Sequence, residues 1–237
     1  MAGETVKTRG IVLDIRPWSR TSHVTTWLTP DRGPVVTVVK GAVRPKSMFL
    51  GQYDLFYSCE LVYYARARGE LHAIREVSCI NMREHIRGDY RATALASYAA
   101  HLVREHCPHS PEAEGWFAFL ERTLDGLVDN PAAERSLICL EREFLALAGL
   151  APGFSGADPS METVPFAIDR GHVGTGTKTV RLSHGALLAL SGESGALQDG
   201  DVSAALRFLG LFMRYHLEMP PEIRRNTLLL LANAGRK

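Results

Sequence analysis

The stretch HVTTWLTPDRGPVVTVVK, residues 23–40, decides the fold of the N-terminal region. Within residues 23–29 two sets of side chains alternate at a two-residue period, which is typical of a half-buried β-strand. Pro30-Asp31-Arg32-Gly33 predicts a turn, and the β-branched run from residue 35 to residue 40 predicts the next strand. The stretch therefore indicates two consecutive strands joined by a tight turn.

Similar patterns on either side of this stretch complete a set of five strands. Further strands are predicted at residues 6–15, ended by Pro17, at 55–64 and at 71–79, with 66–69 as the hairpin between the last two. Five strands in about 80 residues fit a small closed barrel. We therefore expect an α+β chain in which residues 1–80 form a five-stranded barrel domain.

After residue 80 the pattern changes to helical spacing, and residues 81–237 predict an all-α helical domain. The helices are expected at 90–106, 111–127, 131–147, 183–191, 201–218 and 222–232. Residues 149–176 contain many Gly and Pro and lack clear periodicity, and residues 149–180 contain no cysteine. We expect a loop excursion there.

A basic loop follows the third predicted strand in the sequence VKGAVRPKS, residues 39–47. Gly41 allows the chain to turn without a steric cost, and Pro45 stiffens it. Lys40, Arg44 and Lys46 bring positive charge that a neighbouring sheet would hold in place for a phosphate backbone. The alternative is a solvated basic loop without a ligand.

The distribution of charge differs between segments, although the whole chain is nearly neutral with 27 Lys and Arg against 26 Asp and Glu. Residues 1–80 hold eleven cations and seven anions, a balance of +4. Residues 81–151 hold seven cations and eleven anions, a balance of −4. The split predicts a basic part that binds a polyanion and an acidic part that is mainly scaffold.

Composition argues against a membrane protein and a disulfide-linked one. No apolar run approaches the roughly 20 residues that span a bilayer, and residues 1–4 lack the layout of a secretory signal, so we expect a cytosolic protein without membrane contact. The cysteines never form a Cys-x-x-Cys pair, which argues against a zinc knuckle and a redox centre. Reduced, mostly buried thiols are expected at Cys59, Cys79, Cys107 and Cys139.

None of the candidate catalytic motifs fully matches the pattern that it resembles. Residues 171–179, GHVGTGTKT, resemble a phosphate loop but carry Thr where the nucleotide-binding pattern requires Gly before its Lys. Residues 192–195 are one residue short of a nucleophile elbow, and residues 106–109, HCPH, are typical of a polar helix end rather than a metal site. Glu141 and Glu143 point to different helix faces and predict a solvated pair. We therefore expect a protein that is not an enzyme and has no metal.

An ordered set of motifs resembles the RecO family of bacterial DNA repair and recombination proteins over most of the chain. The motifs are Gly10-Ile-Val-Leu13, Leu28-Thr29 with Gly33, Lys40-Gly41-Ala42 with Arg44-Pro45-Lys46-Ser47, and Arg224-Arg225-Asn-Thr-Leu-Leu near the end. The resemblance implies an oligonucleotide/oligosaccharide-binding (OB) barrel followed by a helical domain. It also implies binding of single- and double-stranded DNA, annealing of complementary strands without ATP, and loading of the recombinase RecA together with RecR.

Site residues follow from the resemblance and from their positions. The resemblance implies phosphate contacts by Lys40, Arg44 and Lys46, and we add Arg16, Arg20 and Arg32 because they are placed in loops that flank the same strands. Bases could stack on Trp18, Trp27, Phe49 and Tyr53, which could equally pack in the barrel core or rim. The helical domain is expected to receive the acidic, apolar C-terminal tail of single-strand-binding protein, with Arg104, Arg122 and Arg135 as candidate contacts.

Two departures from the family pattern have consequences. Val43 stands where many relatives carry the first of two consecutive arginines, which should weaken DNA affinity. Many relatives also hold a four-cysteine zinc module, whereas residues 149–180 contain no cysteine and only His172 as a histidine, so neither zinc nor another cofactor is expected. A degenerate module would then keep its shape through a small apolar core of Phe154, Val164, Phe166 and Ile168.

Two other functions remain open. An OB-fold protein-interaction module without direct DNA binding would show an exposed apolar groove and salt-insensitive binding. A role directed at RNA is the other possibility, and no feature of the sequence decides for or against recognition of a 2′-hydroxyl.

Overall fold

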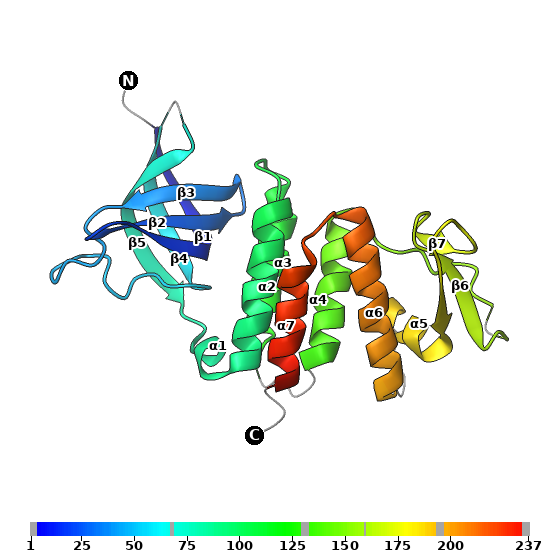
Figure 1. The fold of residues 1–237 in the computed structure, drawn as a ribbon. Helices are drawn as coiled ribbons and strands as arrows, with labels where there is room; N and C mark the ends of the chain where they lie inside the picture. The colour runs from blue at the N-terminus through cyan, green and yellow to red at the C-terminus, as the bar shows by residue number, and fades with distance from the viewer. Residues whose placement is uncertain (1–3, 67–68, 129–132, 159, 193–196, 234–237) are drawn as a thin grey trace. The chain divides into compact units, whose positions relative to one another are not determined.

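The structure, a computed structural model, describes residues 4–66, 69–128, 133–158, 160–192 and 197–233 (Figure 1). The chain forms two compact units, residues 1–128 and 129–237. Within the described ranges the first unit holds a five-stranded sheet and three helices, and the second holds four helices and a three-stranded sheet. The predicted α+β class is confirmed.

The five strands of the first unit close into a barrel (Figure 1). They are β1 (Glu4–Ser19), β2 (Ser22–Thr29), β3 (Gly33–Val39), β4 (Ser58–Ala65) and β5 (Leu71–Asn81). The order around the barrel is β1-β2-β3-β5-β4, and all neighbours are antiparallel except β3 and β5, which are parallel. The first half of β1 pairs with β4 and its second half with β2, so one long strand closes the barrel.

The barrel interior is built around Trp27. This side chain is fully buried and packs in one cluster with Val12 and Leu61. Its indole Nε1 donates to Thr37 Oγ1 at 2.8 Å, so the one polar atom of the ring has a partner inside the barrel. Of the two sets of side chains that alternate in residues 23–29, the set with Trp27 therefore places this ring in the core.

Two strand limits differ from the prediction. Strand β1 continues to Ser19, so the prediction that Pro17 ends it is wrong; an irregularity in the pairing between Pro17 and Ser19 lies where a proline, which lacks an N–H, can be accommodated. Strand β4 begins at Ser58 rather than at residue 55. Phe56 has φ 68°, a left-handed conformation that interrupts a strand, so residues 55–57 belong to the preceding loop.

Three helices follow the barrel in the first unit: α1 (Glu84–Gly88), α2 (Tyr90–His106) and α3 (Ala113–Asp125). The buried side chain of Arg83 joins the last of them to the barrel. Its Nη1 donates to Phe56 O at 2.7 Å and to Ser58 Oγ at 2.9 Å, and its Nε pairs with Asp125 at 2.6 Å. This one guanidinium therefore connects the start of β4 with the end of α3.

The second unit contains α4 (Ala133–Leu147), α5 (His184–Ser191), α6 (Asp199–His216) and α7 (Pro221–Asn233). The predicted start of the first of these helices at residue 131 lies outside the described residues. Glu141 is fully buried and bonds Arg224, so the prediction of a solvated Glu141 is wrong. The reason is a partner 83 residues further along the chain, which no local pattern reveals.

The excursion contains a sheet. Strands β6 (Thr163–Ala167), β7 (His172–Val173) and β8 (Thr179–Ser183) pair antiparallel in the order β7-β6-β8. The prediction of an all-α domain interrupted by a loop is therefore wrong. The predicted apolar core is confirmed, because Val164, Phe166 and Ile168 are buried and the Phe154 ring lies 5.5 Å from that of Phe166. Phe208 of α6 extends this core, with its ring 4.9 Å from Phe166.

Candidate nucleic-acid interface

The basic loop, residues 40–47, leaves the end of β3 as two consecutive tight turns. Arg44 N donates to Gly41 O at 3.2 Å, and Ser47 N donates to Arg44 O at 2.9 Å. Gly41 has φ 71°, which glycine adopts without a steric cost. Backbone hydrogen bonds therefore hold the loop in a defined shape.

Two further hydrogen bonds hold the basic loop beside the turn between β1 and β2. Val43 N donates to Thr21 O at 3.3 Å, and Gly41 N donates to Ser22 Oγ at 3.2 Å. The side chain of Ala42, between the two donors, is buried. The loop and this turn consequently share one end of the barrel, which we call the basic end.

The three predicted phosphate-binding cations are available to a ligand. Lys40, Arg44 and Lys46 are exposed, and among the residues that the structure describes no acidic side chain forms an ion pair with them. Unpaired cations on an anchored loop have little Coulombic stabilisation to lose when a phosphate binds. The loop therefore combines free charge with a backbone that is already ordered.

The basic end also gathers two of the three additional arginines. Arg20 is exposed in the β1–β2 turn, next to Thr21, whose carbonyl accepts from the basic loop. Arg16 lies four residues earlier on β1, opposite Val24, and pairs with Asp14 at 2.6 Å. Five cations from two neighbouring segments thus lie at this end.

Arg32 is not part of that group. It lies in the turn between β2 and β3, where Thr29 pairs with Gly33, whereas the basic end lies where His23 pairs with Val39. Six residues of strand separate the two ends, about 20 Å at the usual rise per residue. Arg32 also pairs with Asp31 at 3.6 Å.

The four aromatic side chains proposed to stack on bases differ in how far they are buried. Trp18 is 62% exposed near the end of β1, so its ring is accessible to a base. Trp27 is 0% exposed, and the prediction of it as a stacking side chain is wrong because the ring fills the barrel core. Phe49 and Tyr53 are half-buried and line a groove beside the basic loop.

That groove has a volume of about 270 Å³ and a mainly apolar lining. Val43, Leu50 and Leu55 line it and are 48%, 50% and 41% exposed. Tyr53 hydrogen-bonds His23 Nδ1 at 2.9 Å, and burial raises the pKa of its phenol to about 12, so it stays neutral. Sequence reasoning missed the groove; its signal is the unusual number of apolar residues in a loop.

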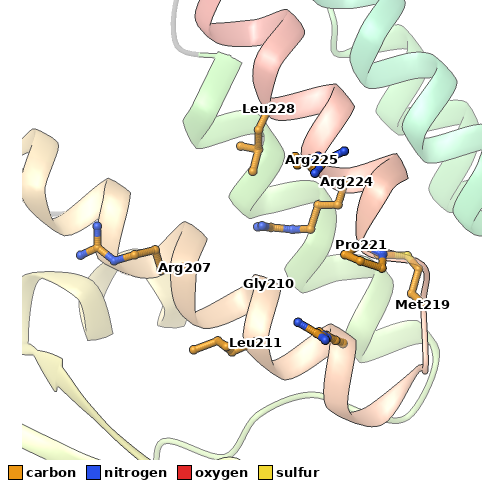
Figure 2. A pocket seen from close by; sticks show the side chains of 9 residues that line it. Arg207, Gly210, Leu211, Met219, Pro221, Arg224, Arg225 and Leu228 are labelled. Atoms are coloured by element: carbon orange, nitrogen blue, oxygen red, sulfur yellow. The ribbon is translucent and has the colours of Figure 1, made fainter.

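A second groove lies in the second unit between α6 and α7 (Figure 2). This α6–α7 groove has a volume of about 400 Å³. Its lining combines the exposed cations Arg207, Arg214 and Arg225 with the apolar side chains Leu211, Met219 and Leu228. Sequence reasoning missed this site, because the cations come from two helices whose pairing the local pattern does not show.

The three arginines proposed as partner contacts are spread over both units. Arg104 lies on α2 and donates to Glu105 at 3.0 Å, and Arg122 is exposed on α3. Arg135 lies on α4 and donates to Leu197 O at 3.3 Å. None of the three lines the α6–α7 groove as the described residues define it.

The described residues hold neither a metal-ligand cluster nor a helix suited to cross a membrane. No group of three or more His, Cys, Asp and Glu side chains there is placed to hold a metal ion. Among the helices in the described ranges, none has the length and apolar character needed to cross a bilayer.

Comparison with known proteins gives a consistent result along the chain. Residues 1–83 match the family model Recombination protein O N terminal, and residues 87–225 match Recombination protein O C terminal. DNA repair protein RecO of Anaeromyxobacter sp. (strain K) is 30% identical over 217 residues, which cover 85% of this chain and 82% of that protein. DNA repair protein RecO of Syntrophus aciditrophicus (strain SB) is 27% identical over 148 residues, 62% of this chain and 57% of that protein. The chain therefore belongs to the RecO family of DNA repair proteins.

Proposed function

We propose that this RecO-family chain is a DNA repair and recombination mediator that binds single- and double-stranded DNA at the basic end of its barrel and anneals complementary strands without ATP. One observation carries the proposal: Lys40, Arg44 and Lys46 are exposed on a hydrogen-bonded loop and have no acidic partner among the described residues. Lysine and arginine bind a phosphate backbone by displacing its counterions. Arg20 and Arg16 extend the same basic end.

The strand arrangement supports an OB-fold for the barrel. OB-folds are five-stranded Greek-key barrels that bind oligonucleotides through the β2–β3 face and adjoining loops. The closed order β1-β2-β3-β5-β4, with β3 parallel to β5, supports this assignment, and the basic loop begins where β3 ends. In this proposal residues 1–80 are the nucleic-acid-binding domain; residues 81–237, predicted as one helical domain, are divided at residue 128 between the two compact units.

Annealing by such a surface needs no catalytic group. Cations lower the repulsion between two phosphate backbones, an aromatic ring holds bases unstacked from their own strand, and base pairing supplies the free energy. Trp18, exposed near the end of β1, is the ring best placed for this role. Phe49 and Tyr53 contribute only at the rim, since both are half-buried.

The proposal is tested by annealing two dye-labelled complementary oligonucleotides in the absence of ATP. The native chain should accelerate annealing, and the triple variant Lys40→Ala, Arg44→Ala, Lys46→Ala should not. The matched control Lys7→Ala, Arg32→Ala, Arg75→Ala removes the same charge from barrel cations that already pair with Glu60, Asp31 and Glu76. Equal loss in both variants, or in neither, would reject the basic loop as the site.

Protein partners belong to the same proposal. The α6–α7 groove suits the acidic, apolar C-terminal tail of single-strand-binding protein, because Arg207 and Arg225 complement its carboxylates and Leu211 its apolar side chains. Its combined charge and apolar lining make it a better candidate than Arg104, Arg122 and Arg135. RecR, RecA loading and a cytoplasmic site of action rest on family membership.

A protein-interaction module without direct DNA binding is the second candidate. It is favoured by the 270 Å³ groove of the first unit, where Val43, Leu50 and Leu55 expose apolar surface. This function predicts partner binding that changes little with salt and that survives removal of the three loop cations. Leu50→Glu would then abolish partner binding while oligonucleotides fail to bind the native chain.

A further inference from the structure

A third cavity lies in the second unit between β8 and α6. The functions proposed for the basic loop and for the α6–α7 groove do not explain the residues that line it. This β8–α6 cavity has a volume of about 570 Å³. The lining residues from the sheet side are Ile168, Thr177, Lys178, Thr179 and Val180, and those from α6 are Leu211, Arg214 and Tyr215. It adjoins the α6–α7 groove, since Leu211 and Arg214 line both.

The wall of the cavity contains the motif that resembles a phosphate loop. Thr177 N and Oγ1 donate to Asp169 Oδ2 at 3.1 and 2.9 Å, and Lys178 N donates to Asp169 Oδ1 at 3.3 Å. An internal carboxylate thus accepts from the backbone amides that a nucleotide phosphate would use in such a loop. These amides are therefore not available to a nucleotide phosphate. The hydrogen bonds of the loop to Asp169 do not involve the Lys178 side chain.

Lys178 lies over an aromatic ring. Its Nζ is 4.7 Å from the centroid of Tyr215, which is 41% exposed. The adjacent Arg214 is exposed, and the described residues give neither cation an ion pair with an acidic side chain. A nucleobase can stack on the ring face that Lys178 covers once the ammonium turns from the ring to a neighbouring phosphate.

We propose that the β8–α6 cavity is a second subsite for single-stranded nucleic acid, in which a base stacks on Tyr215 while Lys178 and Arg214 bind the neighbouring phosphates. The two cations and the ring offer charge and stacking surface in one place, which a nucleic-acid strand uses together. The inference rests on the proposed function, because annealing brings two strands together and a chain with two subsites binds both. The basic end would hold one strand and this cavity the other.

The stoichiometry of binding tests the proposal on the full chain. At low salt, a thymidine hexanucleotide titrated against the native chain should saturate at two per chain. The variant Lys178→Ala, Arg214→Ala, Tyr215→Leu should saturate at one, as should the basic-loop triple variant, and the combined variant should bind none. A native stoichiometry of one that the cavity variant leaves unchanged would overturn the inference. Failure of the proposed function is distinguishable from failure of this inference. If the proposed function fails, the basic-loop triple variant binds the hexanucleotide as the native chain does.

The stacking contact has its own control. Tyr215→Phe keeps the ring and should keep the second site, whereas Tyr215→Leu should weaken it about tenfold. Lys178→Ala alone removes one exposed side chain, so its loss of affinity is not a folding effect. A hexanucleotide carrying a photoreactive iodouracil should crosslink to Tyr215. If the cavity variant instead loses only an acidic peptide and keeps two hexanucleotides, the cavity binds a protein partner and the inference is overturned.

Discussion

Arg224 of α7 pairs with Glu141 of α4 through two hydrogen bonds, from Nε to Oε1 at 2.6 Å and from Nη2 to Oε2 at 2.8 Å. Nη2 also donates to Leu206 O of α6 at 2.8 Å. Both side chains are buried, and Arg224 lines the α6–α7 groove. One guanidinium thus joins three helices beneath a candidate binding surface.

Removing one partner of this pair should destabilise the second unit. Glu141→Gln leaves a buried guanidinium without its counter-ion, and we expect the free energy of unfolding to fall by about 3–5 kcal/mol. Urea unfolding followed by circular dichroism measures the change. The neighbouring Arg225→Gln, at an exposed position, should change it by less than about 0.5 kcal/mol, and equal midpoints for the two variants would contradict a structural role for the pair.

Features that depend on residues close together in the sequence were predictable. The barrel strands follow from alternation and turn residues, as in 23–33, because each strand buries one face and ends at a local turn. The anchored loop with Lys40, Arg44 and Lys46 follows from Gly41 and the strand before it. Residues that are close together in the sequence determine these features, so the sequence alone is enough to predict them.

Features that depend on distant partners were not predictable. Glu141 is buried because of Arg224, and Trp27 is core because the barrel closes around it. Strands β6 to β8 have five, two and five residues and include Pro165, which is too little sequence to show a period. The grooves combine side chains from separate elements, so only the folded chain brings them together.

The Asp169 carboxylate makes the loop at 174–178 sensitive to acid. Hydrogen bonds from the Thr177 hydroxyl and from backbone amides hold the pKa of Asp169 at about 2, below its usual 3.8. Because the folded pKa is depressed, the loop is stabilised fully above about pH 4 and loses that stabilisation as the pH falls toward 2. Carboxyl NMR should give a pKa of about 2 for Asp169, with amide protection of Lys178 lost over the same range. Titration of Asp169 near 3.8 would contradict the bonded geometry.

The four cysteines should differ in reactivity. Burial raises the pKa of Cys59 and of Cys107 to about 12 and raises that of Cys79, so these thiols form little thiolate at neutral pH. Cys139 is exposed on α4. A thiol reagent in excess at pH 8 should therefore modify one cysteine per chain rapidly. Cys139→Ser should remove the fast phase, and a second fast thiol in that variant would contradict the burial of the others.

Trp18 and Trp27 should respond in opposite ways to substitution. Trp18→Ala should weaken single-stranded DNA binding about fivefold, the loss of one stacked base, and leave the unfolding midpoint unchanged. Trp27→Ala should instead lower the free energy of unfolding by about 3–5 kcal/mol, because it opens a cavity in the barrel core. Fluorescence titration with oligo(dT) and urea unfolding of both variants separate the roles. A Trp18 variant with native affinity would remove this ring from the interface.

The salt dependence of single-stranded DNA binding tests the central proposal most directly. Fluorescence anisotropy of a labelled oligonucleotide gives the slope of log K against log salt for the native chain and for Lys40→Ala, Arg44→Ala, Lys46→Ala. Each phosphate contact on a single strand contributes a slope of about −0.7, so we predict weaker binding and a slope shallower by about 2 in the variant. Binding whose affinity and salt slope are unchanged by the three substitutions would contradict the basic loop as a phosphate-binding site.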